Sequence, residues 1–254
     1  MSFKVYIPAR HASSRLPGKL LLPIGGRPML ERVIARARAS GASEVVVAAD
    51  DERIARVAEA CGASVCLTDP ALPSGTDRIA AAAAARGEAR DRIIVNLQGD
   101  EPFMPAAVIA QVAGLLEGAG APDIATVCEP LHSREDWENP NIVKVSRAHD
   151  GRALYFSRAP IPFLRDGEWT PGPLYRRHVG LYAYRVGFLQ RYVAWPPAPI
   201  EEAERLEQLR ALAAGAHILV PDAVAACGVG VDTPADLARA DALAKAQDEA
   251  VCDG

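Results

Sequence analysis

Short apolar runs rich in β-branched residues alternate with amphipathic stretches through the first half of the chain. Between two such runs, for example, Leu30, Val33 and Ala37 recur at helical spacing. Strands that are apolar throughout and alternate with helices are typical of a parallel sheet covered on both faces, and right-handed crossovers make such a sheet doubly wound. The sequence therefore predicts an α/β fold with a doubly wound, mostly parallel sheet. Its expected strands are residues 3–8, 45–49, 64–67, 93–97 and 124–127.

The pattern changes after about residue 139, where apolar and polar residues alternate with a period of two. A Pro- and Gly-rich stretch covers residues 160–173, and the "HDG" at residues 149–151 is typical of a hairpin turn. We therefore expect one domain over residues 1–254, with residues 139–195 forming a smaller antiparallel β insertion. Two closing helices are expected at about 200–213 and 234–245.

Composition narrows the class of protein. No apolar run reaches the roughly 18 residues that a membrane span requires, so we expect no membrane association and a cytoplasmic location. The net charge of −4 argues against a general nucleic-acid binder. The five cysteines are scattered without a C-x-x-C pair, so no zinc or redox site is expected.

Positive charge gathers at the start of the chain, where no acidic residue precedes Glu31. Directly after the first expected strand comes "PARHASSRLPGK", residues 8–19. Ligands of open α/β sheets bind beyond the carboxyl ends of the strands, and small residues let backbone N–H groups curl around phosphate oxygens. Arg10, Arg15 and Lys19 could then neutralise a triphosphate. A solvated basic loop is the alternative, whereas a dehydrogenase is disfavoured because G-x-G-x-x-G is absent. The cations before Glu31 are Lys4, Arg10, Arg15, Lys19 and Arg27.

Seven blocks of this sequence resemble the sugar-acid cytidylyltransferases, and in particular the 3-deoxy-manno-octulosonate (Kdo) cytidylyltransferase family. The resemblance implies a nucleotide-diphospho-sugar transferase-like fold and transfer of CMP from CTP to Kdo, with release of pyrophosphate, for lipopolysaccharide biosynthesis. It also implies a homodimer formed through the antiparallel subregion, which would bind the sugar. The blocks are "IPARHASSRLPGK", "SGTDR", "NLQGDEP", "NPNIVKV", "ALYFSRAPIP", "RHVGLYAYR" and "GVDTPADL".

The resemblance assigns the nucleotide and metal residues. It implies catalytic roles for Arg15, Lys19 and Asp100, and a Mg²⁺ ion held by Asp100 and Asp232. For Asp232 the residues alone favour a plain helix start at Thr233, and Glu101 stays open between the site and the strand-exit turn. The nucleotide-binding residues expected are Pro8, Ala9, Arg10, Arg15, Lys19, Ser74, Gly75, Arg78 and Gln98. Thr76 is an alternative helix N-cap in this loop.

A sugar acid needs a cation for its carboxylate and neutral groups for its hydroxyls. The period of two in "HVGLYAY" places His178, Tyr182 and Tyr184 on one strand face, and we do not assign His178 as a general base. The sugar-acid residues expected are Gln98, Arg158, His178, Tyr182, Tyr184, Glu207 and Gln208.

Three other functions stay open at this point. A CMP-sialate synthetase would share the opening loop and the chemistry, although "NLQGDEP" resembles the sialate enzymes less. An 8-amino-Kdo cytidylyltransferase would act on a sugar that differs from Kdo by one substituent, which an enzyme could distinguish with few contacts. A catalytically silent nucleotide-binding regulator is disfavoured because the cations and both carboxylates are present.

Overall fold

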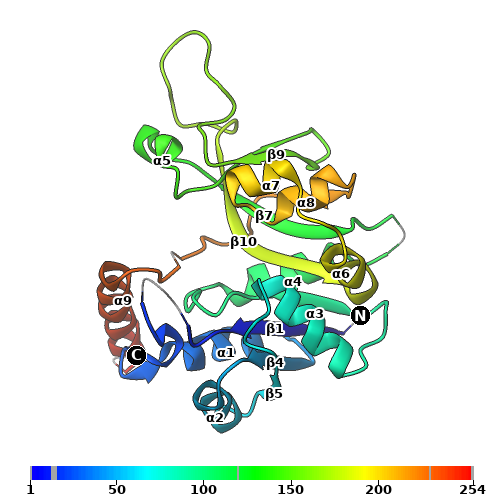
Figure 1. The fold of residues 1–254 in the computed structure, drawn as a ribbon. Helices are drawn as coiled ribbons and strands as arrows, with labels where there is room; N and C mark the ends of the chain where they lie inside the picture. The colour runs from blue at the N-terminus through cyan, green and yellow to red at the C-terminus, as the bar shows by residue number, and fades with distance from the viewer. Residues whose placement is uncertain (1, 13–15, 119, 229, 253–254) are drawn as a thin grey trace.

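A central sheet organises the chain, with helices on both of its faces (Figure 1). The computed structural model describes residues 2–12, 16–118, 120–228 and 230–252, with side chains described up to residue 247. The main strands follow the spatial order β11-β7-β10-β6-β1-β4-β5. They are β1 (Phe3–Ala9), β4 (Glu44–Ala49), β5 (Ser64–Leu67), β6 (Ile93–Asn96), β7 (Ile124–Pro130), β10 (Arg176–Arg185) and β11 (Ile218–Leu219).

The expected fold class is confirmed, and alternate residues of β1 show why. Val5 and Ile7 pack into an apolar cluster with α1, α2, α4 and α9, whereas Tyr6 packs into a second cluster with α3, α6 and α8. A strand buried on both faces in this way is a continuous apolar run, as the sequence has it. These helices are α1 (Met29–Ala39), α2 (Glu52–Ala60), α3 (Gly75–Ala85), α4 (Ala106–Gly114), α6 (Val186–Val193), α8 (Gln208–Ala213) and α9 (Pro234–Cys252).

Strand β10 departs from the expected layout. It pairs antiparallel with both β6 and β7, so it lies inside the main sheet, and the expectation that residues 139–195 form a separate insertion is wrong for it. The hairpin before it is confirmed: β8 (Lys144–Arg147) and β9 (Ala153–Ser157) pair antiparallel around the "HDG" turn. Alternation with a period of two marks an antiparallel strand but does not say which strands it pairs with.

The first closing helix is also different from the expected single helix over residues 200–213. The structure has α7 (Pro199–Glu204) and α8, and the chain between them turns at Arg205, whose φ is 54°. The carbonyl of Glu204 accepts a hydrogen bond from the side chain of Arg158, at 2.7 Å. This side chain satisfies a carbonyl at the end of α7, so the helix can end without a glycine or proline in the sequence.

Several short elements complete the fold. Gly25 and Gly26 have φ of 56° and 75°, as a two-residue hairpin loop requires, and they connect β2 to β3. Among the described residues, no helix is both long and apolar enough to cross a bilayer. The remaining elements are η1 (Lys19–Leu21), β2 (Pro23–Ile24), β3 (Arg27–Pro28) and α5 (Arg134–Glu138).

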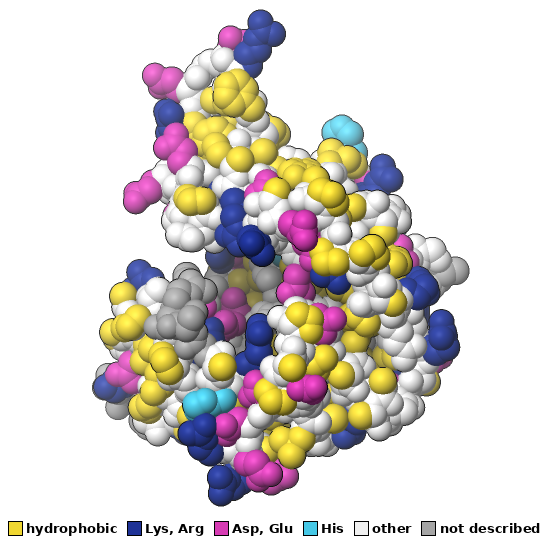
Figure 2. Space-filling view, viewed as in Figure 1, with side chains coloured by type: hydrophobic (Ala, Val, Ile, Leu, Met, Phe, Trp, Pro, Cys, Tyr) yellow, Lys and Arg dark blue, Asp and Glu magenta, His cyan; other side chains and the backbone are white. Residues whose placement is uncertain are grey.

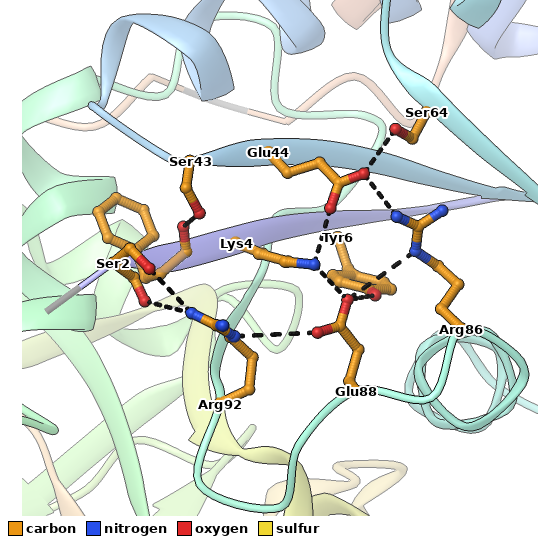
Figure 3. A network of polar contacts seen from close by, with 10 residues as sticks. Ser2, Lys4, Tyr6, Ser43, Glu44, Ser64, Arg86, Glu88 and Arg92 are labelled. Carbon is orange, nitrogen blue, oxygen red and sulfur yellow. Dashed lines mark hydrogen bonds and ion pairs between the residues drawn. The ribbon is translucent and has the colours of Figure 1, made fainter.

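A network of polar side chains lies at the end of the sheet where β1 and β4 begin (Figure 3). Lys4 Nζ lies 2.8 Å from Glu44 Oε2 and 2.6 Å from Glu88 Oε1, and the Tyr6 hydroxyl donates to the same oxygen of Glu88 at 2.8 Å. The Lys4 charge is therefore neutralised locally. The expectation of an unopposed positive field at the start of the chain is wrong for Lys4, because its acidic partners lie far along the sequence.

Candidate active site

A cleft of about 1100 Å³ lies at the carboxyl ends of β1 and β6. Its floor comes from the loop after β1, the loop after β6 and the start of α3, and its opposite wall comes from β10, α6 and the turn between α7 and α8. In Figure 2 this hollow divides the molecule, and both basic and acidic side chains lie around it. The expected position of the site, beyond the ends of the first and fourth predicted strands, is where the structure places the cleft.

Lys19 is the charged centre of the cleft. Its Nζ donates to Asp100 Oδ2 at 2.5 Å, to Asp232 Oδ1 at 3.1 Å and to the Val231 carbonyl at 3.3 Å. Burial acts to lower the pKa of Lys19, but the charges of the two carboxylates outweigh it and raise the pKa above its ordinary value. The ammonium group is therefore protonated at neutral pH, as charge neutralisation on a phosphate requires.

Two distant segments bring the carboxylates together. Asp100 follows β6, Asp232 precedes α9, and the backbone N–H of Val231 donates to the Asp100 carbonyl at 2.9 Å. The interpretation of "DTPAD" as a helix start is confirmed, because Thr233 and Asp236 cap the start of α9 through the Thr233 N–H to Asp236 Oδ2 bond of 2.9 Å. The N–H of Asp232 donates to the same Asp236 oxygen, and its carboxylate accepts a hydrogen bond from Lys19.

Glu101, next to Asp100, does not line the cleft. Burial raises the pKa of its carboxyl to about 8, and the nearby charge of Asp100 acts in the same direction. A Cβ atom at Gly230 would lie only 3.0 Å from Glu101 Oε1. The glycine in "GVDTP" therefore lets the segment carrying Asp232 pass close to this carboxyl.

The predicted nucleotide residues divide into three groups. Those that line the cleft are Pro8, Arg10, Lys19, Gly75 and Gln98. Ala9 is buried in β1, and Ser74 is the N-cap of α3, since its Oγ accepts from the Asp77 N–H at 3.1 Å, so the alternative of a Thr76 cap is wrong. Arg15 lies outside the described residues.

Arg78 is a further predicted nucleotide contact that does not line the cleft. Its side chain is completely buried behind the cleft lining, donates to Thr68 Oγ1 at 2.5 Å and lies 3.5 Å from Asp50 Oδ2. The His11 N–H donates to the other oxygen of Asp50 at 2.8 Å. Arg78 therefore supports the loop after β1 through Asp50 and does not reach the cleft itself.

Most of the residues predicted to bind the sugar acid line the cleft. Gln98, Arg158, Tyr182, Tyr184, Glu207 and Gln208 all line the cleft. Glu207 Oε2 accepts from the Thr76 hydroxyl at 2.8 Å, which joins the α8 side of the cleft to the α3 side. Burial raises the pKa of Glu207 above its ordinary value.

His178 lies one layer behind this wall. Its Nε2 is 2.9 Å from Thr126 Oγ1, and its ring packs on Phe156 and Tyr182. Burial lowers the pKa of His178 to about 3, so the ring is neutral at physiological pH. The period of two along β10 is kept, because Val179, Leu181 and Ala183 pack into the first apolar cluster on the opposite face, while Gly180, Tyr182 and Tyr184 line the cleft.

Sequence reasoning missed part of the wall. Phe188 and Tyr192 on α6 complete its apolar part, and Arg205 and Leu206 come from the α7–α8 turn. The helical spacing of Phe188 and Tyr192 was a usable signal for α6. Nothing in the sequence marks a turn at Arg205.

This fold and site define the class of protein. The chain belongs to the cytidylyltransferase family, whose family model matches residues 5–218. Within it, the chain groups with the 3-deoxy-manno-octulosonate cytidylyltransferases. It is 52% identical to the protein of that name from Thioalkalivibrio sulfidiphilus, over 97% of this chain and 100% of the relative. It is 51% identical to that of Cellvibrio japonicus, over 96% of this chain and 98% of the relative.

Solved structures give the same grouping. A CMP:2-keto-3-deoxy-manno-octonic acid synthetase complexed with CTP superposes with a TM-score of 0.89 at 42% identity, covering 98% of this chain and 100% of its own. A 4-diphosphocytidyl-2C-methyl-D-erythritol synthase has a TM-score of 0.60 at 16% identity, over 95% of this chain and 97% of its own. The second likeness shows a shared fold alone.

Proposed function

We propose that this protein transfers CMP from CTP to Kdo, giving CMP-Kdo and pyrophosphate for lipopolysaccharide biosynthesis in the cytoplasm. The observation that carries the proposal is the cleft in which Lys19, Asp100 and Asp232 meet opposite a wall of tyrosine, glutamate and glutamine side chains. Relatives named for this activity at about half identity support it, as does the similar structure that holds CTP.

In the proposed reaction, the 2-hydroxyl oxygen of the sugar acid attacks the α-phosphorus of CTP. A bond forms between these two atoms while the bond from the α-phosphorus to the pyrophosphate oxygen breaks, and the hydroxyl proton passes to solvent. Transfer of this kind depends mainly on positioning and on neutralising charge. Lys19 and Arg10 line the cleft, and we assign them to the triphosphate, where they would neutralise the charge that builds on the departing pyrophosphate.

The residues present fit a Mg²⁺ ion. Asp100 and Asp232 both contact the single Nζ atom of Lys19, so their oxygens already converge on one cationic position. Mg²⁺ at nucleotide sites is commonly held by one or two carboxylates, with water and substrate phosphate oxygens as its other ligands. Bound Mg²⁺ would supply charge neutralisation at phosphate and lower the pKa of a coordinated hydroxyl.

Lys19 would then change partners. If Asp100 and Asp232 held Mg²⁺, the ammonium group of Lys19 would be released from these carboxylates and could neutralise the phosphate oxygens of the nucleotide. Opposite it, Tyr182, Tyr184, Glu207 and Gln208 would bind and orient the sugar hydroxyls.

Pyrophosphate release tests the proposed function. Protein, CTP and Mg²⁺ are incubated separately with Kdo, 8-amino-Kdo and sialic acid. We expect rapid release with Kdo and little with sialic acid; faster release with 8-amino-Kdo would reassign the natural substrate. Binding of CTP without release in any of the mixtures would favour the silent regulator instead.

We also propose that the protein works as a homodimer. Figure 1 shows a loop that projects from the body of the molecule between β9 and β10. Phe163 and Leu174 on this segment are 82% and 56% exposed, beside a small apolar cluster that includes Trp137 and Tyr175. Exposed side chains of this size next to an apolar cluster suit contact with a second copy of the chain.

Light scattering after size-exclusion chromatography should give the mass of a dimer. Phe163→Glu should shift the mass toward the monomer, because a charge placed in an apolar interface is costly to desolvate. Leu67→Glu, at a 57% exposed residue on the edge strand β5, is the matched control and should stay dimeric. A monomeric wild type would contradict the proposal.

A further inference from the structure

Arg205 has an unusual backbone conformation for its position. Among the described residues it is the one non-glycine residue with a positive φ, in the left-handed region that disfavours side chains with a Cβ. It lines the cleft at the break between α7 and α8, and its side chain is exposed. Residues held in this conformation persist only where the surroundings impose it, and they cluster at functional sites.

Arg158 imposes this conformation. Its Nε donates to the Glu204 carbonyl at 2.7 Å, its Nη1 to the Pro140 carbonyl at 3.0 Å and its Nη2 to the Arg205 carbonyl at 3.5 Å. The Glu204 carboxylate in turn accepts from the Arg158 N–H at 2.8 Å. The guanidinium of Arg158 is therefore committed to the turn, and turning it toward a ligand would break these bonds.

The cations of the cleft lining can be divided by what holds them. Among the described residues they are Arg10, Lys19, Arg158 and Arg205. Lys19 contacts two carboxylates, Arg158 holds the turn, and Arg10 lies on the loop after β1 with the triphosphate residues. Within the described part of the chain, Arg205 is the lining cation on the opposite wall whose side chain makes no hydrogen bond or ion pair.

The nearby acid does not neutralise it. Glu207, two residues further along, is joined to the Thr76 hydroxyl. Arg205 thus lines the cleft beside the groups assigned to the sugar hydroxyls, and its guanidinium is a planar fork of N–H donors that can match a carboxylate through two parallel hydrogen bonds.

We propose that Arg205 binds the carboxylate of the sugar acid and so selects an acidic sugar over a neutral one. This inference rests on the proposed function and adds a specificity residue to it. It reassigns the carboxylate contact from Arg158, expected from the sequence, to a residue that the turn presents and Arg158 supports.

Arg205→Gly is the decisive variant, because glycine removes the side chain and adopts the left-handed conformation freely. We expect KM for the sugar acid to rise by about 10- to 100-fold, the effect of losing a charged hydrogen bond, with KM for CTP within about twofold. Arg205→Lys, which keeps the charge but not the fork, should fall between. Arg56→Ala, at an exposed arginine on α2 away from the cleft, is the matched control and should match wild type.

A second substrate separates carboxylate binding from other roles. The wild type should discriminate strongly against the carboxamide of the sugar acid, and Arg205→Gly should lose most of that discrimination. An unchanged KM for the sugar acid in Arg205→Gly, or a rise confined to CTP, overturns the inference while the proposed function stands. If the wild type itself releases no pyrophosphate with the sugar acid, the proposed function fails and the inference fails with it.

Discussion

Lys19→Ala should lower kcat/KM for pyrophosphate release by about 100- to 1000-fold or more, the loss seen when one preorganised donor to developing charge is removed. Lys19 Nζ is the one atom that contacts both Asp100 and Asp232 in the described part of the chain. Its replacement removes the ammonium that would stabilise the departing pyrophosphate, while the carboxylates remain to hold a cation. The measurement is steady-state release of pyrophosphate at saturating Mg²⁺.

Lys4→Ala provides the matched control for this variant. Lys4 is also a partly buried lysine between two carboxylates, those of Glu44 and Glu88. It lies near the start of β1, however, at the end of the sheet away from the cleft. Its loss should lower the melting temperature and leave kcat/KM close to wild type. A Lys19→Ala enzyme that kept more than about a fifth of wild-type activity would remove Lys19 from the mechanism.

Asp100→Asn combined with chelation should show the second large effect. Excess EDTA should abolish activity of the wild type, and added Mg²⁺ should restore it. Asp100→Asn should lower kcat/KM by about 100-fold or more and raise the Mg²⁺ concentration needed for half-maximal rate, because a neutral amide is a weaker ligand for a hard cation than a carboxylate.

The control for charge loss is Asp166→Asn. Asp166 is 89% exposed on the projecting segment, so its neutralisation should change neither rate nor Mg²⁺ requirement. Activity that persists in excess EDTA would exclude the metal from the reaction. A normal Mg²⁺ requirement in Asp100→Asn would instead move the ion away from Asp100.

The sheet and the position of the site were predictable from sequence because both depend on local pattern. The run Val5-Tyr6-Ile7 is apolar since β1 is buried on both faces, and the basic loop follows it directly. The predicted meeting of Asp100 with Asp232 depended on family resemblance. No periodicity connects two residues so far apart in the chain, and "DTPAD" has a complete local explanation as a helix start.

Two predicted contacts have other partners in the structure, and in both cases the cause is pairing between distant segments. Arg78 was expected at the ligand, but Asp50 and Thr68 hold it behind the cleft lining. Arg158 was expected to contact the sugar, yet its N–H groups donate to backbone carbonyls of the α7–α8 turn and of Pro140. In both cases the residue type predicted the charge correctly. The groups that orient each arginine side chain lie on other segments, and tertiary packing brings those segments next to it.

Strand β10 has a mechanical consequence for the two halves of the cleft. Tyr182 pairs with Asn96, the last residue of β6, so the cleft wall that carries Tyr182 belongs to the same sheet as the strand that leads to Asp100. A continuous hydrogen-bonded ladder therefore sets the spacing between these two sides of the cleft. The α7–α8 turn lies outside that ladder, so a substitution at Arg205 can alter this part of the cleft without disturbing the pairing of β10 with β6.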